Sequence, residues 1–259
     1  MAFDTTTAEI FGLPPYFFFY VTGAVFASSV FILLLLKFKY SISRYTRIFF
    51  LSAAGMLAGA KLFGFLTGLY RALANREAIT TDTFLNTGIV FYGGLIGFLL
   101  TFLLVCRAWN KEIDYGAVDI AAVCVPLFHF WGRLGCFFAG CCYGRESRPA
   151  FSVLYTARIE GEIVTASRVP VQLVESVLNL MIFAVLIIFL FREMFREHLL
   201  IIYLFIYAAM RIVLEFFRGD SVRGVWNGVS FSQLISTVIL IGCILMIAKR
   251  PKEKTYAIH

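Results

Sequence analysis

The run from His129 to Gly144, HFWGRLGCFFAGCCYG, places a histidine, an arginine and three cysteines in an otherwise apolar stretch. A charged side chain within a membrane is costly unless it faces a partner or water, so Arg133 is a candidate functional residue. Its guanidinium is a planar fork of donors that suits a phosphodiester, whereas a structural arginine at this depth requires a buried carboxylate.

His129 and the cysteines have several possible roles. His129 precedes Arg133 by one helical turn, and it could act as a base or satisfy a hydrogen bond in the core. Cys136, Cys141 and Cys142 have the spacing C-x4-C-C, and no second pair of zinc ligands accompanies them. We therefore expect no metal and no cofactor, and we leave a disulfide or a thiol relay open.

A second charged group lies in a later apolar segment. Arg211, Glu215 and Arg218 follow at i, i+4 and i+7, which places them on one face of a predicted helix. They could neutralise one another as an internal ion pair. Together with Arg133 they carry a net positive charge, so we expect a cationic cavity that binds an anion.

Other polar and small residues are predicted near the expected cavity. Gln172 and Glu175 begin an apolar segment and are expected to line the cavity. Tyr92 could donate to an anion, and Gly93 and Gly94 allow the close approach of a ligand or of another helix. Small residues at positions 132, 136, 139 and 140 form a stripe that also permits close helix packing.

The composition indicates a membrane protein. Of the 259 residues, 60% are hydrophobic and 15% are charged, and the mean hydropathy is +0.84, whereas about a quarter of the residues in soluble domains are charged. The net charge of +7 comes from short basic runs beside apolar segments, so we expect no nucleic-acid partner. The first residues lack the basic region of a secretory signal, so we expect no cleavage there.

We predict an all-α integral membrane protein, a single multi-pass domain over residues 1–259 with seven transmembrane helices. The predicted spans cover about 15–36, 48–70, 88–106, 117–143, 171–191, 198–217 and 227–248. The flanking Lys and Arg residues predict an external N-terminus and a cytoplasmic C-terminus. The region of about 144–170 is then a small extracytoplasmic loop, with weak strand signals at 151–155 and 162–164.

The motifs resemble those of the bacterial prolipoprotein diacylglyceryl transferases, over most of the chain. The matching segments are YGGLIG at 92–97, GRLGC to YG at 132–144, PVQLVE at 170–175 and RIVLEFFRGD at 211–220. The resemblance implies a multi-pass enzyme of the bacterial cytoplasmic membrane, among membrane lipids. Such an enzyme moves diacylglyceryl from phosphatidylglycerol to the lipobox cysteine in a prolipoprotein signal peptide, with glycerol phosphate as the leaving group.

The resemblance also implies roles for individual residues. Arg133 and Arg211 match the arginines that hold the phospholipid phosphate, and Gly144 matches the glycine that closes the signature. Tyr16 matches a tyrosine near the start of the first span, and Glu215 matches the acidic residue after the second arginine.

Several positions depart from the family pattern. The usual signature has asparagine at the position of Cys136 and glutamate at that of Cys141, and two family histidines are replaced by Tyr92 and Val169. The base would then be His129 or Tyr92, or the substrate thiol would ionise by another route. A paralogue with the same donor lipid and another acceptor remains open, as does a membrane thiol oxidoreductase that uses the cysteines.

The complete set of predicted site residues comprises Arg133, Arg211, His129 and Tyr92 for catalysis, and Tyr16, Gly93, Gly94, Cys136, Cys141, Gly144, Gln172, Glu175, Glu215 and Arg218 for substrate binding.

Overall fold

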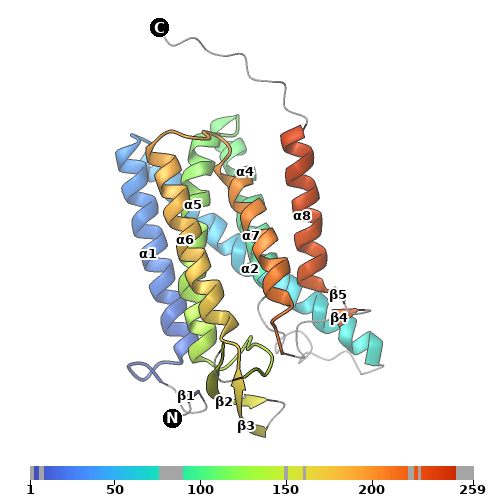
Figure 1. Cartoon of the computed structure of the whole chain (residues 1–259). Helices are drawn as coiled ribbons and strands as arrows, with labels where there is room; N and C mark the ends of the chain where they lie inside the picture. Colours follow the sequence, from blue (N-terminus) through green and yellow to red (C-terminus); the bar gives the residue numbers. More distant parts are fainter. Residues whose placement is uncertain are drawn as a thin grey trace.

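The structure is a bundle of helices with a small sheet at one end (Figure 1). This computed structural model describes residues 3–5, 9–75, 90–148, 151–159, 162–220, 225–226 and 229–248. Its helices are α1 (Pro15–Lys37), α2 (Ile42–Asn75), α4 (Phe91–Asn110), α5 (Tyr115–Phe138), α6 (Val171–Phe191), α7 (Leu199–Glu215) and α8 (Phe231–Ala248). Residues 88–89 and 227–228 of the predicted spans lie outside the described residues.

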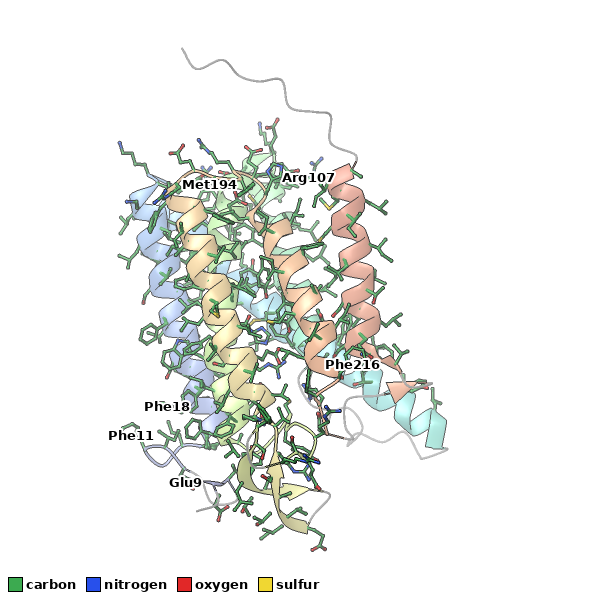
Figure 2. All side chains as sticks on the ribbon, viewed as in Figure 1. Glu9, Phe11, Phe18, Arg107, Met194 and Phe216 are labelled. Carbon is green, nitrogen blue, oxygen red and sulfur yellow. The ribbon has the colours of Figure 1, made fainter. Side chains whose placement is uncertain are left out.

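All these helices except α7 are long and apolar enough to cross a membrane, which gives six candidate spans among the described residues. The prediction of a mostly helical, multi-pass membrane protein is therefore confirmed. Successive helices run in opposite directions, so the chain returns to the same two ends of the bundle. Arg107 and Met194 mark one end, and Glu9 and Phe11 mark the other (Figure 2).

α5 is the central helix, because it packs against α1, α6 and α7. Its first turn is capped by Asp114, whose carboxylate accepts a hydrogen bond from the Ala117 N–H at 3.1 Å. Asp119, which is also buried, accepts hydrogen bonds from the N–H groups of Glu197 at 2.5 Å and Leu199 at 2.9 Å. A side chain of α5 thus caps the start of α7 and fixes the two helices together.

α5 ends at Phe138, five residues before the predicted end of the fourth span at 143. Gly140 has a φ of 75°, in the left-handed region. Its N–H bonds to the carbonyl of Phe137 at 3.3 Å, and the Cys141 N–H bonds to the carbonyl of Cys136 at 3.1 Å. These two bonds form a Schellman motif. The predicted helical stripe of small residues is therefore wrong at its C-terminal end.

A small three-stranded sheet lies at the end of α5 and is built from segments before α1 and after α5, beside the mostly helical bundle. β2 (Val153–Ile159) pairs antiparallel with β3 (Glu162–Arg168) and parallel with β1 (Phe3–Asp4). This confirms the weak strand signals between 144 and 170. A short hairpin of β4 (Val225–Trp226) and β5 (Val229–Ser230) precedes α8.

Tyr155 of β2 holds the sheet against the end of α5. Its phenol donates a hydrogen bond to the carbonyl of Phe137 at 2.7 Å. Burial raises the pKa of Tyr155, so the phenol stays protonated and remains a donor at neutral pH.

Glycines allow α2 and α4 to approach closely. A Cβ at Gly59 would lie 2.3 Å from the carbonyl oxygen of Gly93, and a Cβ at Gly97 would lie 2.3 Å from that of Gly55. Helix packing therefore accounts for Gly93. By contrast, a Cβ at Gly132 would meet nothing within 4 Å, so the predicted packing role of Gly132 is wrong.

Replacing Gly97 by alanine should destabilise the bundle, because the added methyl group meets a backbone carbonyl that cannot move aside. We expect a loss of about 1–3 kcal/mol, seen as a lower melting temperature of the purified protein in detergent. Gly132→Ala adds the same methyl group to open space within α5 and should melt at or above the temperature of the wild type, because alanine favours a helix more than glycine does. Equal melting temperatures for both variants would contradict the close contact of α2 with α4.

Candidate active site

Glu175, in the second turn of α6, is the carboxylate around which the buried cations gather. It is only 1% exposed. Its Oε1 lies 3.0 Å from Nη2 of Arg133 on α5, and its Oε2 lies 3.9 Å from Nη1 of Arg211 on α7. The phenol of Tyr207 donates to Oε1 at 3.3 Å. Glu175 is thus the buried carboxylate that a structural arginine requires, and it joins three helices.

Arg211 is buried and only partly satisfied. Its Nη2 lies 2.8 Å from Oε2 of Glu215 and donates to Oγ of Ser232 on α8 at 3.2 Å. Its Nη1 makes no hydrogen bond to any described residue. A buried donor without a partner costs about 1–3 kcal/mol, and such groups are rare in native structures. Nη1 of Arg211 is thus ion-paired with Glu175 at 3.9 Å but makes no hydrogen bond to a described residue, so it can still donate one to a ligand.

His129 contacts Arg133 directly. The Arg133 Nε–H donates to Nε2 of His129 at 3.2 Å, which requires the tautomer protonated on Nδ1. The imidazole stacks on Phe91 of α4 with ring centroids 3.8 Å apart. In this arrangement the free lone pair of His129 accepts from Arg133, and the same Nε2 lies 3.7 Å from Oε1 of Glu175.

Arg218 lies beyond the end of α7, so the prediction that it continues the helix face of Arg211 and Glu215 is wrong. Its guanidinium forms two bonds to Asp220, Nε to Oδ1 at 2.7 Å and Nη2 to Oδ2 at 2.5 Å. Its backbone forms a β-bridge with Gly144, next to the cysteines.

The buried charges of this region balance one another. The cations are Arg133, Arg211 and Arg218, and the anions are Glu175, Glu215 and Asp220. The expectation of a net cationic cavity is therefore wrong for these groups. Pairing within the cluster reduces the cost of burial, since an unpaired charge in a low dielectric is far more expensive.

Gly144 is required by the close approach of backbone segments. A Cβ there would lie 2.2 Å from the carbonyl oxygen of Val169. Beside it, the Gly219 N–H donates to the carbonyl of Tyr143 at 3.0 Å. The segments that follow α5 and α7 are thus bonded to each other, and packing accounts for Gly144.

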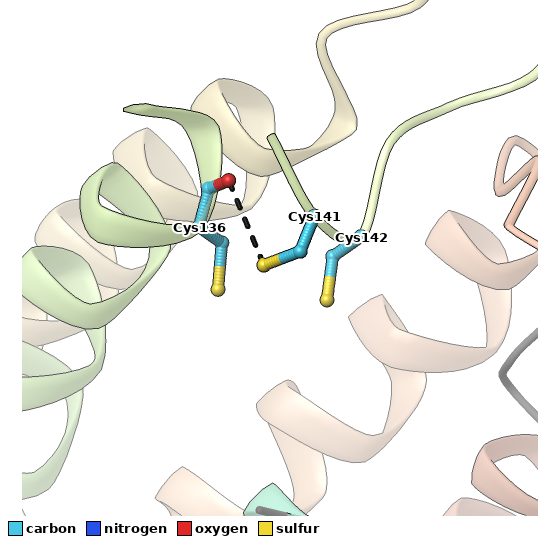
Figure 3. Close-up of side chains that lie close together, drawn as sticks. All are labelled: Cys136, Cys141 and Cys142. Carbon is cyan, nitrogen blue, oxygen red and sulfur yellow. Dashed lines mark hydrogen bonds between the residues drawn. The ribbon is translucent and has the colours of Figure 1, made fainter. Parts of the chain in front are cut away.

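The Schellman motif gathers three thiols at the end of α5. The Sγ atoms of Cys136, Cys141 and Cys142 lie within 4.8 Å of one another, and Figure 3 shows them on the same side of the turn. All three are free thiols. Gln172, which is buried at the start of α6, donates from Nε2 to the carbonyl of Cys141 at 2.8 Å and holds the turn in place.

The remaining predicted residues lie around the cluster of buried charged residues. Tyr92 is buried, and its hydroxyl shares a hydrogen bond with Oγ of Ser236 on α8. Tyr16, in the first turn of α1, packs near Gly135 of α5. Gly94 lines an apolar cavity of about 140 Å³ between α1, α2, α4 and α5.

Sequence reasoning missed three residues that complete the site. Tyr207 precedes Arg211 by four residues, and this helical spacing could have revealed it. Asp220 lies two residues after Arg218, but its role depends on a turn that hydropathy does not indicate. Ser236 is on α8, and nothing in its local sequence distinguishes it.

Comparison with known proteins identifies relatives along nearly the whole chain. The phosphatidylglycerol–prolipoprotein diacylglyceryl transferase of Clostridium tetani is 28% identical over 242 residues, which are 90% of this chain and 92% of the relative. A second such transferase, from Clostridium perfringens, is 28% identical and covers 92% of both chains. That of Campylobacter hominis is 30% identical over 158 residues, 60% of this chain and 53% of the relative.

The family model described as prolipoprotein diacylglyceryl transferase matches residues 7–249, a range that includes every residue of the charged cluster and of the cysteine turn. This chain therefore belongs to the prolipoprotein diacylglyceryl transferase family.

Proposed function

We propose that this chain transfers the diacylglyceryl group of phosphatidylglycerol to the lipobox cysteine of a prolipoprotein signal peptide. The relatives are named for this donor and this acceptor. The observation that carries the proposal is the buried Nη1 of Arg211, which has no hydrogen-bond partner among the described residues and lies beside the Arg133–Glu175 pair.

The reaction is a displacement at the glycerol carbon that bears the phosphate ester. The thiol sulfur forms a bond to this carbon, and the departing phosphate keeps the electron pair of the broken C–O bond. Because charge grows on the phosphate oxygens, guanidinium donors held in a dry site stabilise the transition state. Nη1 of Arg211 offers such a donor without the loss of an existing hydrogen bond.

The apolar cavity supports a lipid donor. Phe91 belongs to its wall and also stacks on His129, so the cavity adjoins the charged cluster. An acyl chain in this cavity would place the headgroup phosphate near Arg133 and Arg211.

We further propose that α7 is a seventh span, that the N-terminus is external and that the protein lies in the bacterial cytoplasmic membrane as one multi-pass domain. The 17 residues of α7 span about 26 Å at 1.5 Å per residue, close to the thickness of a bilayer core. Lys37 and Arg107 lie in the last turns of α1 and α4, and Arg192 follows α6. These helices end at the same end of the bundle, which supports a cytoplasmic position for that end.

The role of the planar guanidinium donors can be tested with substitutions that keep the positive charge. Arg133→Lys and Arg211→Lys keep a cation beside Glu175 but lose the planar donors, so we expect kcat to fall about 10²–10³-fold. The assay follows thioether formation on a lipobox peptide by the reconstituted protein with phosphatidylglycerol. Arg196→Lys, at an exposed position whose guanidinium pairs with Glu193, is the matched control. Full activity in Arg133→Lys and Arg211→Lys would refute the phosphate-binding role.

His129 should act by positioning Arg133. His129→Ala removes the acceptor of the Arg133 Nε–H, and we expect a loss of roughly 10- to 100-fold from misalignment. His129→Gln supplies an amide oxygen as acceptor and should recover much of this loss, with an unchanged pH profile of kcat. If the glutamine variant is as inactive as the alanine variant and the acidic limb of the profile disappears, His129 is the base.

A second candidate function is the same donor chemistry with another acceptor. It is favoured by the hydrogen bonds of His129 to Arg133 and of Tyr92 to Ser236, since neither side chain then offers a free base to a lipobox thiol. Mass spectrometry of lipid products with and without a lipobox peptide separates the two functions. We expect glycerol phosphate release to require the peptide, and release with transfer to another molecule would support the alternative acceptor.

A further inference from the structure

The turn after α5 brings together three thiols that are not part of the ion pairs among the buried arginines and carboxylates. The Schellman motif folds Cys141 back onto α5, and Cys142 has a φ of 59°, a left-handed conformation that is uncommon outside glycine. The thiol of Cys141 donates to the carbonyl of Cys136 at 3.7 Å (Figure 3). The turn, held by Gln172, thus brings three sulfurs to within 4.8 Å of one another.

The spacing of the three thiols is close to that of a metal site. Zinc binds thiolate sulfur at about 2.3 Å, so sulfurs in a tetrahedral site lie about 3.8 Å apart. The Sγ atoms here already lie within 4.8 Å of one another, and small rotations about χ1 would close the difference. The C-x4-C-C spacing predicts no metal because a second pair of ligands is missing, yet the turn itself brings three ligands together.

Two guanidinium groups lie near the cysteine turn, and both are close to Cys142. Arg133 and Arg218 both interact electrostatically with Cys142. Three thiolates on one Zn²⁺ carry a net charge of minus one, which the nearby guanidinium groups stabilise. Three protein ligands also leave the fourth position of a tetrahedral zinc ion open, as in catalytic sites.

The reaction needs a thiolate, and the site has no evident base to make one. The lone pair of His129 accepts from Arg133, and Glu175 is ion-paired with the same arginine. The hydroxyl of Tyr92 is hydrogen-bonded to Ser236, and an ordinary phenol ionises only at about pH 10. Coordination to zinc ionises a thiol outright at neutral pH.

We propose that Cys136, Cys141 and Cys142 bind one Zn²⁺ ion whose fourth position accepts the thiol of the acceptor substrate. This inference rests on the proposed transferase function. The three cysteine thiols release their protons to solvent when Zn²⁺ binds, and the incoming thiol gives its own proton to solvent as it binds the ion. Its sulfur then forms the C–S bond, the C–O bond to phosphate breaks, and glycerol phosphate leaves with the electron pair, so no oxidant or reductant is required.

Metal binding is tested with Zn²⁺ alone on the full chain in detergent, by equilibrium dialysis and elemental analysis. We expect one Zn²⁺ per wild-type chain and none above background in C136A/C141A/C142A. Cobalt substitution should give sulfur-to-metal charge-transfer bands in the wild type. The control is C124A/C243A, which removes two buried thiols outside the turn and should still bind one ion.

Three outcomes would overturn the zinc site. They are no stoichiometric Zn²⁺ in the reduced wild type, equal binding by the triple variant, and a disulfide among the three cysteines that persists when Zn²⁺ is present. The measurement on the wild type does not depend on the folding of any variant.

An activity experiment separates failure of this inference from failure of the proposed function. If both are right, a chelator should lower thioether formation at least 10-fold, and added Zn²⁺ should restore it. Full activity in chelator refutes the zinc site and leaves the transferase intact. No transfer under any condition, with phosphatidylglycerol and Zn²⁺ present, refutes the transferase itself.

Discussion

The buried carboxylate of Glu175 is the group on which the arrangement of the central helices depends. It lies where water cannot stabilise its charge, so cations must reach it from neighbouring helices. Arg133 lies on α5 and Arg211 lies on α7. Both reach Glu175 only if α5 and α7 pack beside α6 with these two residues turned toward it. Loss of one partner from such a pair costs about 3–5 kcal/mol, so the electrostatics select one packing.

The same cluster is balanced in charge but not in hydrogen bonds. Three guanidinium groups face three carboxylates, which makes the cluster tolerable in a low dielectric. Nη1 of Arg211 nevertheless lacks an acceptor among the described residues. A site of this kind is stable without a ligand and would still gain a hydrogen bond from an entering acceptor, which in the proposed reaction is a phosphate oxygen.

The end of the bundle beside the sheet is built from turns, and backbone hydrogen bonds hold them. The segment after α5 bonds to the segment after α7 through Tyr143 and Gly219, and Tyr155 anchors the sheet to the end of α5. These contacts place the cysteine turn close to the charged cluster. The helices therefore position Arg133 and Arg211, and the turn after α5 brings Cys141 and Cys142 to Cys136.

The sequence by itself determined the membrane-spanning helices and the types of residue in the site. Apolar segments of this length must be helical in lipid, because only a helix satisfies its own backbone, and buried charges such as Arg133 and Arg211 are conspicuous there. Only the tertiary structure decided that Glu175 pairs with both arginines, that α5 stops at Phe138 and that three thiols meet. Such features depend on helix neighbours and on left-handed turn conformations, which hydropathy and residue spacing do not encode.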